Sequence, residues 1–284
     1  MNTNIDNMKT LIDSIQPPII LALKSPFGAS EVERVAAVKD GFNLIDLEKY
    51  LPNPLSMRAK PTFTDEGSFV CYVNNFAVDG STRIYAELDA EENKFTLRAV
   101  IDDHDCLEKM PSWRNHIATY SPKTSLDYRR WIERDRKPFD QEGFAEFIQD
   151  NIRAIATPKD MPLMPTGAQM LKVATEFDAS TSLRFRSKKN LQNGQSQLTY
   201  VEEGTSNETN IIVPDAFALG IKVFMNGDGY QINARLKYRT NSGELKFTYE
   251  LDRPDLAFDK AARDVIERIA IQTGITPLFG SVAA

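Results

Sequence analysis

The hydrophobic pattern of this 284-residue chain changes its period near Asp178, and this change constrains the fold more than any other feature. Before Asp178, apolar residues recur mostly at every third or fourth position, which is typical of amphipathic helices. After it, apolar and polar residues alternate, which is typical of strands with one buried face. Helices and antiparallel hairpins in separate runs favour an α+β fold over parallel βαβ units.

Helices are predicted wherever apolar residues recur on one helical face. The predicted ranges are 3–15, 67–77, 113–120, 126–134, 139–157, 167–177 and 255–273. Pro17 and Pro18 end the first helix, because proline cannot continue the hydrogen-bond ladder. Thr166 is expected to cap the helix that follows it, since its hydroxyl can accept a free backbone N–H.

Three antiparallel hairpins are predicted from regular alternation. They pair residues 82–88 with 94–101, 183–189 with 197–203, and 230–239 with 244–251, and a further strand covers 211–213. Asn193 and Gly194 fit the positive backbone dihedrals of a tight hairpin turn. A proline-rich loop at 158–165 is the expected boundary between two parts of the chain.

The predicted architecture is therefore α+β, with antiparallel sheets, flanking helices and two lobes. Residues 1–160 form an N-terminal α+β lobe with a helical middle. Residues 161–284 form a C-terminal antiparallel sheet with a closing helix. No apolar run approaches the roughly 18–20 residues of a membrane span, so no membrane partner is expected.

The net charge and the number of cysteines exclude some classes of protein. The formal net charge of −6 argues against a general binder of polyanions, although it allows local basic patches. Cys71 and Cys106 are too few for a disulfide framework and fit a reducing cytoplasm, which is the expected location. The polar residues 1–12 are not expected to be a secretory signal.

The sequence contains no glycine-rich phosphate loop, dinucleotide fingerprint, nucleophile elbow or CxxC pair. We therefore expect no catalytic residues and no cofactor, and the chain is predicted not to be an enzyme.

One polar cluster is compatible with an alternative function, that of a metal-dependent hydrolase. Asp102, Asp103 and His104 are followed by His116, and carboxylates with imidazoles can hold a metal ion that activates water. Their spacing matches no usual metal template. We therefore expect a solvated acidic turn at a strand end, with His116 packed on a helix and no metal bound.

Residues 112–137 interleave aromatic and basic side chains. Seven bases face three acids there, and the four aromatic residues are Trp113, Tyr120, Tyr128 and Trp131. Aromatic rings beside arginines can stack on nucleic-acid bases. The alternative is an amphipathic helix with a solvated basic face and a buried tryptophan.

Two predicted strands carry bases at every second position, so that each places three positive charges on one face. The residues are Arg184, Arg186 and Lys188 in the first strand, and Arg235, Lys237 and Arg239 in the second. If both strands share a sheet, its outer face can bind nucleic-acid phosphate or an acidic subunit surface. Residues 79–110, with nine acids and four bases, are a candidate for such a surface. The alternative is a solvated basic face that discourages edge pairing.

Several segments resemble the YfdQ-type prophage proteins, a domain of unknown function. They are residues 43–48, 50–52, 67–73, 144–147, 212–214 with Phe217, 235–239 and 253–254. The resemblance covers roughly residues 30–280, and its motifs are structural in character. It implies a gene in the early region of a prophage, and it supplies no catalytic residues.

The predicted function is that of a non-catalytic, self-assembling accessory protein of a phage early region, which binds nucleic acid or host or defence proteins. A closed homo-oligomer is expected, because large apolar groups and open strand edges need cover. The alternatives are a nucleic-acid-binding accessory of recombination or replication and a metal-dependent hydrolase.

Overall fold

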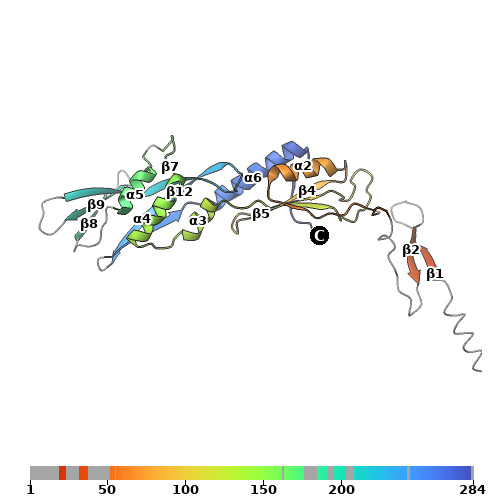
Figure 1. The fold of residues 1–284 in the computed structure, drawn as a ribbon, viewed down its shortest axis with the longest axis horizontal. Helices are drawn as coiled ribbons and strands as arrows, with labels where there is room; N and C mark the ends of the chain where they lie inside the picture. The colour runs from red at the N-terminus through yellow and green to blue at the C-terminus, as the bar shows by residue number, and fades with distance from the viewer. Residues whose placement is uncertain are drawn as a thin grey trace, which may run out of the picture.

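The structure is a computed structural model that describes residues 19–23, 32–37, 52–54, 56–161, 163–175, 184–190, 195–201, 208–241 and 244–282. Side chains are described for residues 52–54, 56–161, 163–175, 213–239 and 244–282. Within these ranges the chain forms five α-helices and four sheets, most of whose strand pairs are antiparallel (Figure 1). The predicted α+β class is confirmed.

The first large sheet has five strands in the order β14-β4-β5-β6-β3. Its strands are β3 (Thr62–Phe63), β4 (Arg83–Asp89), β5 (Lys94–Val100), β6 (Ile117–Tyr120) and β14 (Leu278–Phe279). β4 and β5 form the predicted hairpin, while the short edge strands β3 and β14 pair in parallel. Helix α2 (Glu66–Phe76) packs against this sheet and is capped by Asp65, whose carboxylate accepts the Ser68 N–H at 2.8 Å.

The second large sheet has four strands in the order β13-β12-β11-β7. Its strands are β7 (Ile155–Ala156), β11 (Ala216–Lys222), β12 (Gly229–Asn241) and β13 (Glu244–Leu251). Helices α3 (Leu126–Arg134) and α4 (Gln141–Asp150) cover one face, and α5 (Gly167–Thr175) lies beside α4. Phe139 exchanges two backbone hydrogen bonds with Phe247 of β13, so that the segment after α3 covers the β13 edge.

Two smaller sheets complete the described strands. One pairs β1 (Ile19–Leu23) with β2 (Val32–Ala37). The other has the order β10-β9-β8, built from β8 (Arg184–Asn190), β9 (Gln195–Val201) and β10 (Glu208–Pro214). The predicted helix at 3–15 and the turn at Asn193 and Gly194 lie outside the described residues.

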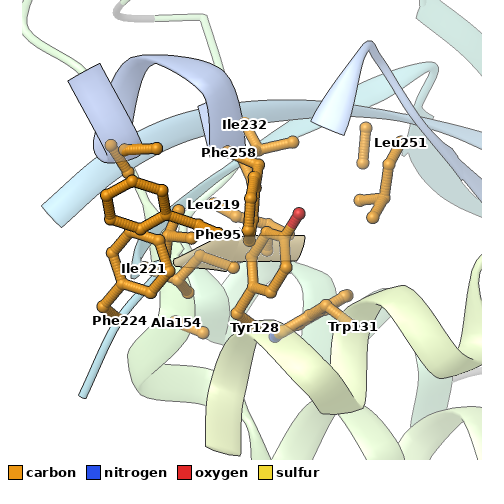
Figure 2. Packing of buried hydrophobic residues seen from close by; sticks show 14 of the residues in the cluster. Phe95, Tyr128, Trp131, Ala154, Leu219, Ile221, Phe224, Ile232, Leu251 and Phe258 are labelled. Atoms are coloured by element: carbon orange, nitrogen blue, oxygen red, sulfur yellow. The ribbon is translucent and has the colours of Figure 1, made fainter. Parts of the chain in front are cut away.

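One contiguous hydrophobic core joins the two large sheets. Phe95 of β5 lies 5.8 Å from Phe224, which follows β11, and Phe224 lies 5.4 Å from Phe258, measured between ring centroids (Figure 2). Phe258 belongs to α6 (Pro254–Thr273), the helix that reaches from the four-stranded sheet to α2 (Figure 1). The two predicted lobes, divided near residue 160, are therefore not confirmed.

An ion pair ties α6 to α2 next to this core. The Arg268 guanidinium donates two hydrogen bonds to the Glu66 carboxylate, at 2.9 and 3.0 Å. This two-point geometry fixes the relative orientation of the two side chains, and with them the ends of the two helices.

Two helix predictions are wrong in part. Residues 113–120 contain the strand β6 instead of a helix, because Ile117, Ala118 and Tyr120 pair with β5 and are buried there. The predicted helix at 139–157 ends at Asp150, after which a 3₁₀ turn (Ile152–Ala154) leads into β7. In both places pairing with a sheet overrides the local helical pattern.

None of the helices within the described ranges is long and apolar enough to cross a membrane.

Candidate functional site

The outer face of β12 carries the bases that its alternation predicts. Arg235, Lys237 and Arg239 are exposed, while Ala234 and Leu236, which face the other side of the strand, are buried. For this strand, the predicted placement of three bases on one solvent-facing side is confirmed.

The other basic strand lies elsewhere. Arg184, Arg186 and Lys188 belong to β8, which pairs with β9 in the three-stranded sheet. The premise that both basic strands share one sheet is therefore wrong, because β12 lies between β11 and β13 in a sheet that, among the described strands, does not include β8. The side chains of β8 are outside the described residues, and their predicted role in binding stays a prediction.

A groove of about 560 Å³ runs along the outer face of β12 and β13. We call it the basic groove; it is lined by Arg136, Pro138, Lys237, Tyr238, Arg239, Glu244, Lys246, Thr248 and Glu250. Arg136 reaches it because the chain turns sharply after α3, with a left-handed φ of 59° at Arg136. Its backbone N–H donates to the Tyr249 carbonyl at 2.9 Å, which holds this turn against β13.

The acids in the groove neutralise one end of it. The Glu250 carboxylate accepts a hydrogen bond from Lys237 and lies 3.2 Å from the Arg136 guanidinium. The hydrogen bond from Lys237, together with the charge of its ammonium group, holds the pKa of the Glu250 carboxyl below its ordinary value. Arg235 lies just outside the groove, 3.9 Å from Asp252.

Positive charge outweighs negative charge at the opposite end of the groove, where Arg239 and Lys246 lie with Glu244. Arg239 and Lys246 are direct partners across the β12–β13 ladder, so their side chains leave the sheet on the same face. Like charges directly opposite one another destabilise a strand pair unless an anion meets them. Lys246 forms an ion pair with Glu244 at 3.9 Å, and no ion pair between described residues includes Arg239.

The aromatic residues of 112–137 divide into two kinds. Tyr120, Tyr128 and Trp131 are buried, so their rings cannot stack on an external base. The alternative of an amphipathic helix with a buried tryptophan and a basic solvated face is therefore confirmed for α3, whose Arg129, Arg130 and Arg134 are exposed. Trp113 differs from the other three, because 88% of it is exposed.

The acidic cluster at 102–105 is not the solvated turn that its sequence predicts. Asp103 is only 3% exposed, and its carboxylate accepts hydrogen bonds from the Tyr85 hydroxyl at 2.6 Å and from Arg114 Nε at 2.7 Å. The Asp102 carboxylate accepts the backbone N–H groups of Asn115 and His116, at 2.8 and 2.9 Å. These carboxylates close the loop between β5 and β6.

The two histidines also make contacts within the fold. His116 is buried and hydrogen-bonded to the Tyr72 hydroxyl of α2 at 2.7 Å, which confirms its predicted packing on a helix. Burial lowers the pKa of its imidazole, so the neutral form is favoured. His104 Nδ1 accepts the Ser112 N–H at 3.0 Å. Among the described residues, no three His, Cys, Asp or Glu side chains gather in a way that could hold a metal ion.

Two residues that line the groove, Lys246 and Arg136, were not predicted as binding residues from the sequence. Lys246 enters the groove because antiparallel pairing sets it opposite Arg239, and the alternation of 244–251 already placed Lys246 and Glu250 on one face. Arg136 enters because the segment after α3 runs beside β13, for which the local sequence has no signal.

The chain can be compared with protein families and with curated proteins. A family model, described as an uncharacterized conserved protein (DUF2303), matches residues 4–282. A search of curated proteins gave no match. The matched range includes both large sheets, the basic groove and the loop between β5 and β6.

Proposed function

This chain belongs to the DUF2303 family of uncharacterized conserved proteins, and from that premise we propose that it is a non-catalytic, self-assembling protein that binds an anionic surface in its basic groove. The observation that carries the proposal is the pair Arg239 and Lys246. These exposed cations lie directly opposite each other, with the Glu244 carboxylate 3.9 Å from Lys246, and a further anion would relieve their remaining repulsion.

The support beneath the groove favours a binding role. The inner face of the same strands carries Phe247 and Tyr249, whose rings contact Phe144, Phe139 and Trp131. A groove on such a closely packed aromatic base is held in one shape, so little conformational freedom is lost when a partner binds.

The charge pattern favours a protein partner over nucleic acid. Acids are interspersed with the bases of the groove, as Glu250 and Glu244 show, and the whole chain is acidic. A nucleic-acid interface is usually far more positive, because each phosphate carries a charge. The exposed Arg129, Arg130 and Arg134 on α3 support the alternative of direct nucleic-acid binding.

The polar cluster at 102–116 supports a non-catalytic role. Its carboxylates accept hydrogen bonds from groups of the same fold, and Asp103 is turned inward. These side chains stabilise the loop. The resemblance to YfdQ-type prophage proteins further supports our proposal that the protein is an accessory of a temperate phage, working in the host cytoplasm.

A double charge reversal tests the groove. Arg239→Glu with Lys246→Glu should abolish self-association and capture of partner proteins, because the site then repels an acidic surface. The fold should survive, since both side chains are exposed and make no buried contact. The measurement is sedimentation velocity at micromolar concentration, together with circular dichroism.

A matched control carries the same change in net charge. Lys159→Glu with Lys260→Glu alters two exposed lysines that do not line the groove. This control should keep the parent's mass. If the groove variant also keeps the parent's mass and partners, the groove is not the binding site. If it loses only salt-dependent binding to short DNA or RNA strands, the nucleic-acid alternative replaces the proposal.

A further inference from the structure

The loop that joins β5 to β6, residues 101–116, is held in a single shape by its own polar groups. Besides the bonds to Asp102 and Asp103, the Asp105 carboxylate accepts the N–H groups of Leu107 and Glu108, at 2.7 and 3.0 Å. The Asp105 N–H donates to the Met110 carbonyl at 2.9 Å. We call this segment the stapled loop.

The loop is also attached to the turn before β4. The Cys106 N–H donates to the Gly80 carbonyl at 3.1 Å, and Leu107 Cδ1 lies 2.9 Å from the position that a Gly80 Cβ would take. Gly80 has a φ of 79°, which also favours glycine. The close approach of Leu107 thus depends on the missing side chain at Gly80.

The fixed loop presents apolar side chains to solvent. Leu107 is 73% exposed, Trp113 is 88% exposed and Met110 is 38% exposed. An apolar surface that includes a tryptophan is typical of a contact site, because tryptophan is enriched among the residues that dominate binding energy. A loop that is already ordered loses little conformational entropy on binding. More of the free energy gained by burying its apolar side chains then contributes to the affinity.

The stapled loop and the basic groove lie at opposite ends of the two-sheet core. The start of β5 lies next to α3, which covers the four-stranded sheet, because Asn93, just before β5, accepts a hydrogen bond from the Tyr128 hydroxyl of α3. The stapled loop follows Val100 at the far end of β5. The groove lies towards the end of β12 and the start of β13, where Arg239 pairs with Lys246. Figure 1 shows β12 extending away from β4 and β5.

We propose that the stapled loop of one copy docks in the basic groove of a second copy, with Trp113 as the anchor. The inference rests on the proposed function and names the partner of the groove. Indole rings bind guanidinium and ammonium groups through cation–π contacts, and Arg239 and Lys246 are available for them. Pro138 lines the same groove and offers carbon surface to the ring.

Charge complementarity supports the same pairing. The stapled loop and the turn before β4, residues 101–116 and 79–83, carry five acids and three bases, including the exposed Asp79 and Glu108. The groove carries four bases and two acids. Because the two surfaces differ, the contact is heterologous, and successive copies join head to tail until a ring closes.

Two variants and their mixture test this contact. Trp113→Ala removes the anchor, while Arg239→Glu with Lys246→Glu disables the groove. Each variant alone should sediment as a single chain of 32.0 kDa at concentrations where the parent is assembled. An equimolar mixture should form a dimer of twice that mass, because one intact loop meets one intact groove. Ile271→Ala, which removes an exposed apolar side chain from α6, should keep the parent's mass.

The outcomes separate the inference from the proposed function. If the groove variant is monomeric while Trp113→Ala keeps the parent's mass, the loop is not the partner, although the groove still binds. If both variants are monomeric and the mixture stays monomeric, the two surfaces do not bind each other. If neither variant changes the mass, both proposals fail. Circular dichroism of each variant should match the parent, since all three side chains are exposed.

Discussion

Replacing Trp131 with alanine should lower the free energy of unfolding by about 3–5 kcal/mol, the usual cost of deleting a fully buried aromatic side chain. Trp131 is 0% exposed and joins α3 to α4 and to the four-stranded sheet. Its ring centroid lies 4.8 Å from that of Phe147, 5.1 Å from that of Tyr249 and 5.8 Å from that of Phe217. Urea unfolding followed by circular dichroism measures the loss.

The second tryptophan of the chain is the matched control for this prediction. Trp113→Ala removes the same atoms from an exposed site, so at a protein concentration too low for assembly it should change the free energy of unfolding by no more than about 0.5 kcal/mol. Trp131→Phe should cost less than Trp131→Ala, because it keeps a ring and removes an indole N–H that has no hydrogen-bond partner among the described residues. Equal losses for Trp131→Ala and Trp113→Ala would contradict this account of the core.

Replacing Asp103 with alanine should lower the free energy of unfolding by about 2 kcal/mol at neutral pH, since the Tyr85 hydroxyl and Arg114 lose their shared acceptor. The loss stays moderate because about a third of the Arg114 side chain is exposed and water can replace the carboxylate there. Asp103 is therefore part of a buried network, and the prediction that it lies in a solvated turn is wrong.

The same substitution should change the dependence of stability on pH. Burial alone raises the pKa of the Asp103 carboxyl, but the hydrogen bonds it accepts, first that from Tyr85, outweigh burial and hold the pKa below 3.8. A lowered pKa means that the ionised group stabilises the fold above its ordinary pKa, and that this stabilisation disappears as the pH falls through the lowered value. The parent should therefore lose more stability than Asp103→Ala below about pH 4.

The exposed Asp79 provides the control for charge. Asp79→Ala removes one carboxylate from the same end of the sheet and should change the free energy of unfolding by no more than about 0.5 kcal/mol. If Asp103→Ala and Asp79→Ala gave the same unfolding curves at pH 7 and at pH 3, the buried network around Asp103 would have no energetic role.

Much of the fold could be predicted from local pattern. Alternation in residues 230–251 predicted the β12–β13 hairpin, and the residues facing outward on β12 are those that the pattern placed there. Helix α3 spans Leu126–Arg134, as its apolar spacing predicted, and Thr166 accepts the Gln169 N–H at the start of α5. These features depend on neighbours in the sequence, so the sequence alone reveals them.

What could not be predicted depends on distant pairing. Residues 117–120 become a strand because β5 is available beside them, and β14 was missed because it joins the sheet of β4 from a distant part of the chain. β11 was missed although it pairs with the next strand, β12, because Phe217, Ala218 and Leu219 are all buried and give no alternation. The positions of the site residues also depend on contacts between distant segments of the chain. No local signal brings Arg136 to β13, separates β8 from the sheet of β12, or turns Asp103 inward towards Tyr85.

Sedimentation velocity of the unmodified chain at micromolar concentration, repeated from low to high salt, tests the central claim most directly. Self-assembly through a basic groove predicts a mass that is a multiple of 32.0 kDa at low salt. Because salt screens contacts between exposed charges, that mass should fall towards a single chain as the salt concentration rises. A mass of 32.0 kDa at every salt concentration would contradict the claim.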